Sequence, residues 1–384
     1  PEFSGEWNKY TINDLATVVG GGTPDTTVKS YWGGDIQWFT PSEIGKNKYV
    51  DFSKRTITRD GLDNSSAKLL PLHTILLSSR ATVGECSIAS NECTTNQGFQ
   101  SLIAKQCNID FLYYLIQTKK KDLIRNACGS TFLEISANEI RKIKVAVPVQ
   151  NEQEQIAKLL SLIDERIATQ NKIIEDLKKL KSAISKYLFA RKDLLETTIC
   201  LSNIATLKNG YAFQSGKYNA LGKWKILTIT NVPGERYIND EDCNCIINLP
   251  NDIQDHQVLK EGDILISLTG NVGRVSLCKN GNYLLNQRVG LLQLAKNVNQ
   301  EFLYQILSSQ RFENSMIACG QGAAQMNIGK GDVENYVLPY SSNGNNILFA
   351  AKILHSYDEC IINELRRLTL LTMQKQYLLT QMFI

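Results

Sequence analysis

Residues 154–188 read EQIAKLLSLIDERIATQNKIIEDLKKLKSAISKYL, and apolar side chains recur in them at alternating steps of four and three. This spacing is the heptad seam of a coiled coil. The apolar members of this first seam are Ile156, Leu160, Ile163, Ile167, Ile174, Leu177, Ile184 and Leu188. Two polar residues, Gln170 and Lys181, interrupt it. We therefore predict one long helix that needs a second helix to bury its seam.

The same seam recurs 194 residues further along the chain. Its apolar members are Leu354, Tyr357, Ile361, Leu368, Leu371 and Leu378, and its polar interruptions are Glu364 and Lys375. About 150 residues separate the two helices, so the chain can return and pair the seams antiparallel. Polar seam positions lower the stability of such a pair but fix its register. In the alternative arrangement each helix packs on its own domain, which would leave a narrow seam where a broad apolar face is usual.

The rest of the chain is also written twice. Residues 15–18 (LATV) resemble residues 204–207 (IATL), and residues 75–78 (ILLS) resemble residues 264–267 (ILIS), both at an offset of 189. The offset drifts to 190 and then 191, as insertions in loops would produce. Each copy mixes short β-type runs with Gly, Asn and Ser turns and a few helical stretches.

These patterns predict an α+β fold. Its parts are a first mixed α/β domain at 1–150, a first long helix at 151–191, a second mixed domain at 192–342 and a second long helix at 343–384. We expect the two helices to form an antiparallel coiled coil, with the two homologous domains related by a pseudo-two-fold axis.

Composition narrows the class of protein. The 384 residues carry a net charge of only +4, which is compatible with nucleic-acid binding but does not indicate it. No apolar run approaches the ~20 residues that span a bilayer, no signal peptide opens the chain, and Pro1 in place of Met suggests an omitted leader. The three histidines lie far apart and no C-x-x-C pair occurs, so a metal site has little support. Scattered cysteines such as Cys86, Cys128, Cys278 and Cys319 are expected to be buried, reduced thiols in the cytoplasm.

The chain lacks the motifs of enzymes that modify nucleic acids. Its eight prolines are never adjacent, so the Asn/Asp-Pro-Pro-aromatic signature of amino-methyltransferases cannot occur. No glycine–lysine pair is followed by Ser or Thr, which excludes a Walker A loop. The glycines at 20–22 and 320–322 do not extend to G-x-G-x-x-G and are better interpreted as turns. We expect no catalytic residue, no metal and no cofactor in this chain.

Several motifs resemble those of the specificity subunits of type I restriction–modification systems. These motifs are residues 1–7 (PEFSGEW), 21–24 (GGTP), 31–38 (YWGGDIQW), 262–273 (GDILISLTGNVG) and 286–288 (NQR). The turn Val147-Pro148 before residues 152–157 (EQEQIA) is similar to the start of the family's central helix. The second helix starts differently, with residues 345–350 (NNILFA) in place of a Glu/Gln-rich segment. The resemblance covers nearly the whole chain, including its duplicated order of domain and helix.

This resemblance implies a cytoplasmic, non-catalytic scaffold. The two mixed domains would be target recognition domains that each read half of a split, asymmetric DNA sequence, and the helices would set the spacing between the halves. Two adenine-N6 methyltransferase subunits and translocating endonuclease subunits would bind to the scaffold. S-adenosylmethionine, ATP and Mg²⁺ would bind to those partners, and no membrane would be involved.

Polar loops that can reach a groove are the candidate DNA contacts. A cationic run, with Tyr49 and Phe52 between its members, suits phosphate contacts and comprises Lys46, Lys48, Lys54, Arg55 and Arg59. Loops after matching strands present Ser79, Arg80 and Thr82 in the first copy, and Thr269, Asn271 and Arg274 in the second. The remaining candidates are Asn96, Gln97, Asn286, Gln287, Arg288, Gln321, Gln325 and Asn327. The alternative is that these residues form solvated loops and hairpin turns whose amides brace the backbone.

Two other functions stay open on the sequence alone. In the first, the chain is a protein–protein adaptor on a coiled-coil bar that never touches DNA, and salt-dependent duplex binding would separate this reading from the DNA-binding one. In the second, it is a self-contained DNA methyltransferase, which the missing motifs disfavour.

Overall fold

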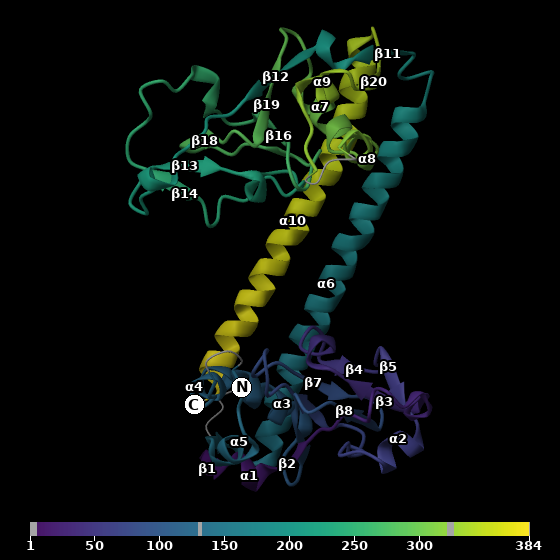
Figure 1. Ribbon diagram of the computed structural model, residues 1–384, viewed down its shortest axis with the longest axis vertical. Helices are drawn as coiled ribbons and strands as arrows, with labels where there is room; N and C mark the ends of the chain where they lie inside the picture. Colours follow the sequence, from purple (N-terminus) through teal and green to yellow (C-terminus); the bar gives the residue numbers. More distant parts are fainter. Residues whose placement is uncertain (1–5, 130–132, 321–325, 384) are drawn as a thin grey trace. The chain divides into compact units, whose positions relative to one another are not determined.

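The computed structural model describes residues 6–129, 133–320 and 326–383, and the chain forms two compact units (Figure 1). Unit 1 comprises Pro1–Asn171 and Arg367–Ile384, and unit 2 comprises Lys172–Arg366. Each unit contains one mixed α/β domain together with parts of both long helices. The predicted segments separated helices from domains, whereas the compact units cut across both helices, because each domain packs its core on the nearest helix turns.

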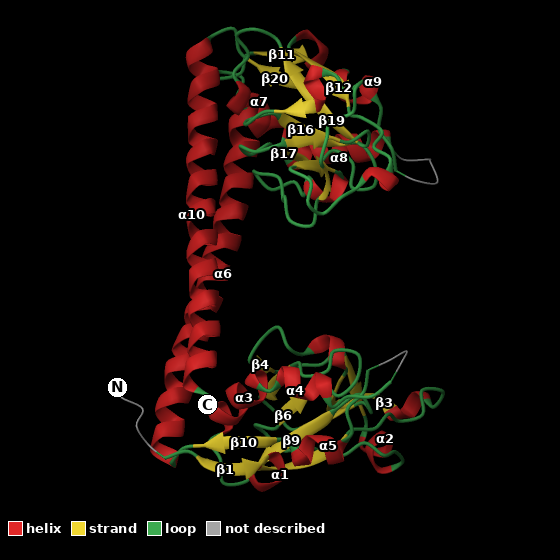
Figure 2. Cartoon of the chain, turned by 90° about the vertical axis from the view of Figure 1, so that its left-hand side faces the viewer, coloured by secondary structure: helices red, strands yellow, loops and turns green. Residues whose placement is uncertain are grey.

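The sheets of unit 1 are small. One has the order β2-β9-β6-β7-β4, with β2 (Ala16–Gly20), β9 (Gln100–Ala104), β6 (Ile75–Leu77), β7 (Cys86–Ala89) and β4 (Tyr49–Val50). Another has the order β5-β3-β8, with β5 (Arg55–Ile57), β3 (Trp32–Phe39) and β8 (Cys93–Thr95). Strands β1 (Asn8–Thr11) and β10 (Lys144–Val147) pair antiparallel and lie side by side in Figure 2. The helices are α1 (Ile12–Leu15), α2 (Arg59–Asp63), α3 (Ile109–Thr118), α4 (Lys120–Arg125) and α5 (Ala137–Lys142), with short 3-10 turns η1 (Lys29–Tyr31) and η2 (Pro41–Glu43).

Unit 2 repeats this topology. The order β12-β19-β16-β17 matches β2-β9-β6-β7, with β12 (Ala205–Asn209), β19 (Val289–Leu294), β16 (Ile264–Ser267) and β17 (Val275–Leu277). The order β14-β13-β18-β15 contains the counterpart of β5-β3-β8, with β14 (Asn244–Ile246), β13 (Trp224–Leu227), β18 (Tyr283–Leu285) and β15 (Val258–Leu259). Strand β11 (Thr197–Cys200) pairs with β20 (Val337–Tyr340), as β1 does with β10. The remaining elements are α7 (Gln300–Leu307), α8 (Gln310–Cys319), α9 (Lys330–Glu334) and the 3-10 turns η3 (Leu201–Asn203), η4 (Ser215–Lys217), η5 (Ile229–Asn231) and η6 (Asp255–Gln257).

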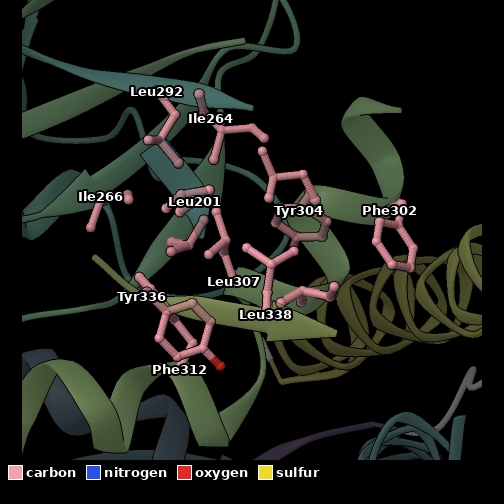
Figure 3. Close-up of a cluster of buried hydrophobic side chains, with 14 of the residues drawn as sticks. Leu201, Ile264, Ile266, Leu292, Phe302, Tyr304, Leu307, Phe312, Tyr336 and Leu338 are labelled. Atoms are coloured by element: carbon pink, nitrogen blue, oxygen red, sulfur yellow. The ribbon is translucent and has the colours of Figure 1, made fainter. Parts of the chain in front are cut away.

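Matching helices start in the same way in the two units. The side chain of Asn108 accepts a hydrogen bond from the Phe111 N–H (3.0 Å) and so caps α3, and Asn299 does the same for Phe302 (2.8 Å) at the start of α7. The capped helices bury their phenylalanines in the two domain cores, and Figure 3 shows Phe302 with Leu201 and other side chains of the unit 2 core. Each such buried side chain stabilises its domain by about 1.5–3 kcal/mol.

The long helices are α6 (Gln150–Ala190) and α10 (Gly344–Met382). In unit 1 the start of α6 packs against the end of α10, where the Lys375 Nζ lies 2.7 Å from Asp164. In unit 2 the end of α6 packs against the start of α10, where the Lys181 Nζ lies 2.6 Å from Asp358. In antiparallel helices, the residue numbers of facing partners have a constant sum. That sum is 539 for both lysine–aspartate pairs, so the helices run antiparallel and keep the same register in both units.

The fourteen apolar side chains predicted for the two seams are all buried or half-buried. Ile156, Leu160 and Leu354 are completely buried. The predicted fold class is therefore confirmed: two mixed α/β domains and two long helices that pack antiparallel.

The cysteines follow the prediction only in part. Cys86 and Cys278 are buried, and burial raises the pKa of each thiol to about 12. Cys128 and Cys319 are exposed, so the prediction of burial was wrong for them. Cys128 follows the end of α4, and Cys319 is the last residue of α8. The buried residues of these helices, Leu123 in α4 and Phe312 and Met316 in α8, all come before the cysteines. Within the described ranges, no helix has a stretch apolar enough, over the required length, to cross a bilayer.

Candidate nucleic-acid interface

The turn between β6 and β7 in unit 1 is built again between β16 and β17 in unit 2. The Gly84 N–H donates to the Ser78 carbonyl (3.0 Å), and the Gly273 N–H donates to the Ser267 carbonyl (2.9 Å). The hydroxyls of Ser78 and Ser267 are buried, and each donates to the carbonyl two residues on, at 3.1 and 3.2 Å. The two units therefore present the same loop frame.

The same turn requires left-handed backbone at two matching positions. Ala81 and Gly270 have φ of 63° and 70°, and Gly84 and Gly273 have φ of 89° and 77°. Glycine adopts this conformation freely, whereas a residue with a side chain, such as Ala81, is strained by about 1 kcal/mol. Backbone geometry thus holds the loop, and the polar side chains on it are free to differ.

The side chains on this frame do differ between the units. In unit 1, the backbones of Arg80 and Glu134 form an isolated antiparallel β-bridge. Their side chains also form an ion pair, in which the Arg80 guanidinium lies 2.7 Å from the Glu134 carboxylate and about two-fifths of each side chain is exposed. The matching bridge in unit 2 joins Thr269 to Asn327. A charged pair in unit 1 is replaced by a buried hydroxyl and an exposed amide in unit 2, so the two loops carry different side chains on one backbone.

A second loop lies against the first in each unit. Its asparagine braces it: Asn96 Oδ1 accepts from the Gly98 N–H (2.9 Å), and Asn286 Oδ1 accepts from the Arg288 N–H (3.2 Å). The first loop donates to it, from the Ser79 N–H to the Gly98 carbonyl (2.9 Å) in unit 1 and from residue 268 to Arg288 (3.0 Å) in unit 2. We call these neighbours the paired-loop edge, residues 79–82 with 96–98 in unit 1 and residues 268–271 with 286–288 in unit 2.

A third segment closes over the paired-loop edge and needs glycine. A Cβ on Gly21 would lie 2.0 Å from the Asn96 carbonyl oxygen, and one on Gly210 would lie 2.1 Å from the Asn286 carbonyl oxygen. Only glycine permits so close an approach. Two residues beyond Gly21, the Thr23 hydroxyl donates to Gln97 Oε1 (2.5 Å), so this segment also brings polar groups to the edge in unit 1.

The cationic run of unit 1 does not act as one surface. Lys46, Lys54, Arg55 and Arg59 are exposed, and Arg59 faces Asp63 at 3.5 Å. Lys48 points inward, with its Nζ 2.7 Å from Asp110 and 2.6 Å from the Ser161 hydroxyl, and its side chain is only 10% exposed. The prediction that Lys48 contacts DNA is corrected, because its charge is already neutralised between α3 and α6.

Two further candidates are too buried to reach a groove. Ser79 has no exposed surface, and Leu268 is buried at the matching position of unit 2, so this position belongs to the domain core. Asn286 is only 9% exposed and braces its own loop, as the alternative interpretation of these amides foresaw.

The other candidates lie at or near the surface. Thr82, Gln97, Asn271, Gln287, Arg288 and Asn327 are exposed, and Arg80, Asn96, Thr269 and Arg274 are half-buried. Arg274 faces Glu313 at 3.5 Å. Gln321 and Gln325 lie outside the described residues. DNA contact by the surface candidates remains a prediction.

A buried charged joint, which the sequence reasoning missed, fastens the domain of unit 2 to the helices. Arg236 lies 2.6 Å from Glu301 on α7 and 2.9 Å from Asp358 on α10, and the Arg236 and Asp358 side chains are 8% and 7% exposed. The Gln305 amide also donates to Asp358 (2.6 Å), and Lys181 on α6 completes the joint. Burial disfavours the charged form of Glu301, but hydrogen bonds from Arg236 and Gln305 outweigh it and hold the pKa of Glu301 below its usual value.

Unit 1 has a joint of the same design and different chemistry. Lys48 pairs with Asp110 on α3, the Tyr114 hydroxyl donates to Asp164 (2.7 Å), and Asp164 pairs with Lys375. The sequence carried a signal for both joints, because the two aspartates recur at the same offset of 194 as the two lysines. That recurrence places an acid opposite each lysine of the seams, Asp358 opposite Lys181 and Asp164 opposite Lys375.

The part of the chain that the structure describes offers no cluster of three or more His, Cys, Asp or Glu side chains that could hold a metal ion. Of the buried carboxylates, Asp358 lies in the joint of unit 2, and Glu152 accepts a hydrogen bond from the Trp7 indole (3.3 Å). The polar groups of the paired-loop edge suit hydrogen bonding and charge pairing with a ligand.

Comparison with known proteins agrees with the duplicated architecture. The family model described as "Type I restriction modification DNA specificity domain" matches twice, over residues 4–179 and 196–373. The specificity subunit of the type I restriction enzyme MjaIX from Methanocaldococcus jannaschii is 38% identical over 192 residues, which are 48% of this chain and 44% of that protein. The specificity subunit of EcoR124I/EcoR124II from Escherichia coli is 28% identical over 198 residues, 50% of this chain and 48% of that protein. The chain thus spans about half the length of the curated relatives it matches.

A solved structure shares the fold over the whole chain. The type I restriction–modification S subunit from M. genitalium superposes with a TM-score of 0.59 at 18% sequence identity, covering 100% of this chain and 97% of that one. At this identity the likeness concerns the fold alone.

Proposed function

Because the chain belongs to the family of type I restriction–modification DNA specificity domains, we propose that it binds an asymmetric, two-part DNA target and reads one part with each unit. The chain itself performs no reaction in this proposal. Methyltransferase subunits, and endonuclease subunits with them, would bind to it and would carry S-adenosylmethionine, ATP and Mg²⁺.

One observation carries the proposal: the paired-loop edge is the same in backbone and different in side chains. Hydrogen-bonding groups on a fixed frame are what base discrimination requires, because each base pair presents its own pattern of donors and acceptors. Unit 1 offers Thr82 and Gln97 at this edge, and unit 2 offers Asn271, Gln287 and Arg288. Two units with different groups would read different sequences, so the target should be asymmetric.

Phosphate contacts would come from exposed cations of the two units. Lys46 and Lys54 in unit 1 and Arg288 in unit 2 are exposed, and none of them forms an ion pair among the residues described. Each phosphate contact made by such a cation releases a counterion, so binding should weaken steeply as salt rises. A net charge of +4 is sufficient for this if the cations are local to the binding face.

The long helices would set the distance between the two parts of the target. A helix rises 1.5 Å per residue, so the 41 residues of α6 extend for about 60 Å. Helices of this length, closed by a salt bridge in each unit, would act as a spacer of defined length.

The test is duplex binding by the complex of this chain with its methyltransferase subunits, measured against salt concentration and with a pool of random duplexes. The proposal expects a negative salt dependence and enrichment of two separated sequence blocks. Binding that ignores DNA sequence, or no binding to duplex at all, would instead support a protein–protein adaptor that leaves DNA to its partners.

A further inference from the structure

We infer that Arg55 reads a guanine in the part of the target that unit 1 binds. This inference rests on the proposed DNA-reading function and deepens it, because it assigns one base to one side chain. Lysine and arginine candidates in the same run could equally serve as phosphate contacts. The surroundings of Arg55 distinguish it from the others.

Arg55 is stacked on an aromatic pair. Its Cζ lies 3.6 Å from the ring centroid of Trp32 and 5.4 Å from that of Trp38, and the two indoles meet edge to face at 5.0 Å with an interplanar angle of 90°. Stacking of this kind holds the guanidinium plane in one orientation while leaving its N–H groups free to donate. The side chain is exposed, so this fixed plane faces solvent.

The aromatic pair is fastened to the segment that closes over the paired-loop edge. The Trp38 Nε1–H donates to the Gly22 carbonyl (2.9 Å), and the Trp32 Nε1–H donates to the Asp25 carbonyl (3.1 Å). Thr23, between these two residues, donates to Gln97 on the edge. Arg55 is therefore linked, through the two indoles, to the segment that carries Thr23 to the paired-loop edge.

Arg55 also keeps its charge and donors for a ligand. Arg80 and Arg59, the other arginines predicted to contact DNA in unit 1, both face carboxylates, Glu134 and Asp63. Arg55 forms no such ion pair with any residue that the structure describes. A planar, oriented arginine with free N–H groups matches the O6 and N7 acceptors of guanine in the major groove, which it binds with two parallel hydrogen bonds.

Unit 2 offers an internal control for this inference. In unit 1, Trp38 of β3 pairs with Arg55 of β5 and with Thr94 of β8. At the same place in unit 2, Ile226 of β13 pairs with Asn244 of β14 and with Leu284 of β18, so both the indole and the arginine are replaced there. A guanine preference that depends on Arg55 should therefore appear in one part of the target only.

The test compares the base preferences of the assembled complex carrying wild-type chain, Arg55→Ala or Arg55→Lys, selected on duplexes randomised across the target. Arg55→Ala should abolish a guanine preference at one position of one part, lower affinity for the wild-type target about tenfold or more, and leave the other part unchanged. Arg55→Lys keeps the charge but not the planar fork, so it should also lose the preference. Arg125→Ala, which removes an exposed arginine of α4 paired with Asp122, is the matched control and should leave all preferences intact.

Two results would overturn the inference and one would overturn its premise. If Arg55→Ala weakens binding to all sequences equally and Arg55→Lys restores it, Arg55 is a phosphate contact. Unchanged preferences in both variants would mean that it does not touch DNA. If the wild-type complex shows no sequence preference, the proposed function itself fails. Thermal melting of the Arg55→Ala and Arg55→Lys variants checks that any loss reflects binding and not unfolding.

Discussion

The ammonium group of Lys181 lies 2.6 Å from the carboxylate of Asp358, at a position where the coiled-coil seam was expected to be polar. The equivalent pair in unit 1 is Lys375 with Asp164, whose charged groups are 2.7 Å apart. Lys375 follows Lys181 by 194 positions, and Asp358 follows Asp164 by the same number. A polar residue in a seam costs stability unless it finds a partner on the facing helix. Each lysine has such a partner, so these two polar positions fix how the helices meet, as expected of polar seam residues.

Removing the acid of the unit 2 joint should destabilise the protein strongly. Asp358→Asn would leave the buried charges of Arg236 and Lys181 with one partner fewer, and an uncompensated buried charge costs about 3–5 kcal/mol. Urea unfolding of the chain should show a loss of that order, whereas Asp176→Asn, at an exposed position of α6, should change the unfolding free energy by less than about 0.5 kcal/mol. Similar losses of unfolding free energy in the two variants would mean that the joint stabilises the protein no more than an exposed charge does.

Acid should weaken the same joint through Glu301. The pKa of Glu301 is lower in the folded protein than in the unfolded chain, so the unfolded chain binds the proton more tightly. Its contribution is complete above the unfolded value of about 4.3 and is lost as pH falls through the folded pKa. Unfolding free energies measured from pH 6 down to pH 3 should fall less steeply for Glu301→Gln than for the wild type. Parallel pH profiles would contradict this assignment.

The glycines of the segment that closes over the paired-loop edge should be essential to DNA reading. Gly210→Ala would place a methyl group about 2 Å from the Asn286 carbonyl, so the segment must move away from the edge. We expect DNA affinity of the complex to fall at least tenfold, with the changed base preference confined to one part of the target. Gly216→Ala meets nothing within 4 Å and should bind as the wild type does. Equal binding by both variants would show that the edge is remote from DNA.

Much of the architecture could be predicted because its signals are local and repeated. The heptad spacing of residues such as Ile156 and Leu354 depends only on the neighbouring turns of each helix, and the duplicated runs could be aligned by eye. The availability of a side chain for DNA could not be predicted in this way. Lys48 looks like a surface cation until Asp110 and Ser161, more than sixty residues away, fold against it. Ser79 looks like a loop hydroxyl, yet the backbone carries it into the core.

The length of the helices should control the spacing of the two target parts. Deleting one heptad from each helix, residues 167–173 of α6 and 366–372 of α10, leaves both lysine–aspartate pairs in the chain. Seven residues of helix are about 10 Å, close to three base pairs at ~3.4 Å each. Selection on duplexes with varied spacers should show a preferred spacer about three base pairs shorter. An unchanged preferred spacer would show that helix length does not set the distance between the two target parts.

The most direct test is the DNA sequence methylated by cells that carry the methyltransferase subunits with wild-type chain, with Gln97→Ala or with Gln287→Ala. Two separated, unlike blocks are expected for the wild type, with Gln97→Ala relaxing one block and Gln287→Ala relaxing the other. A single continuous block, or one block altered by both substitutions, would contradict the claim that each unit reads its own part of the target.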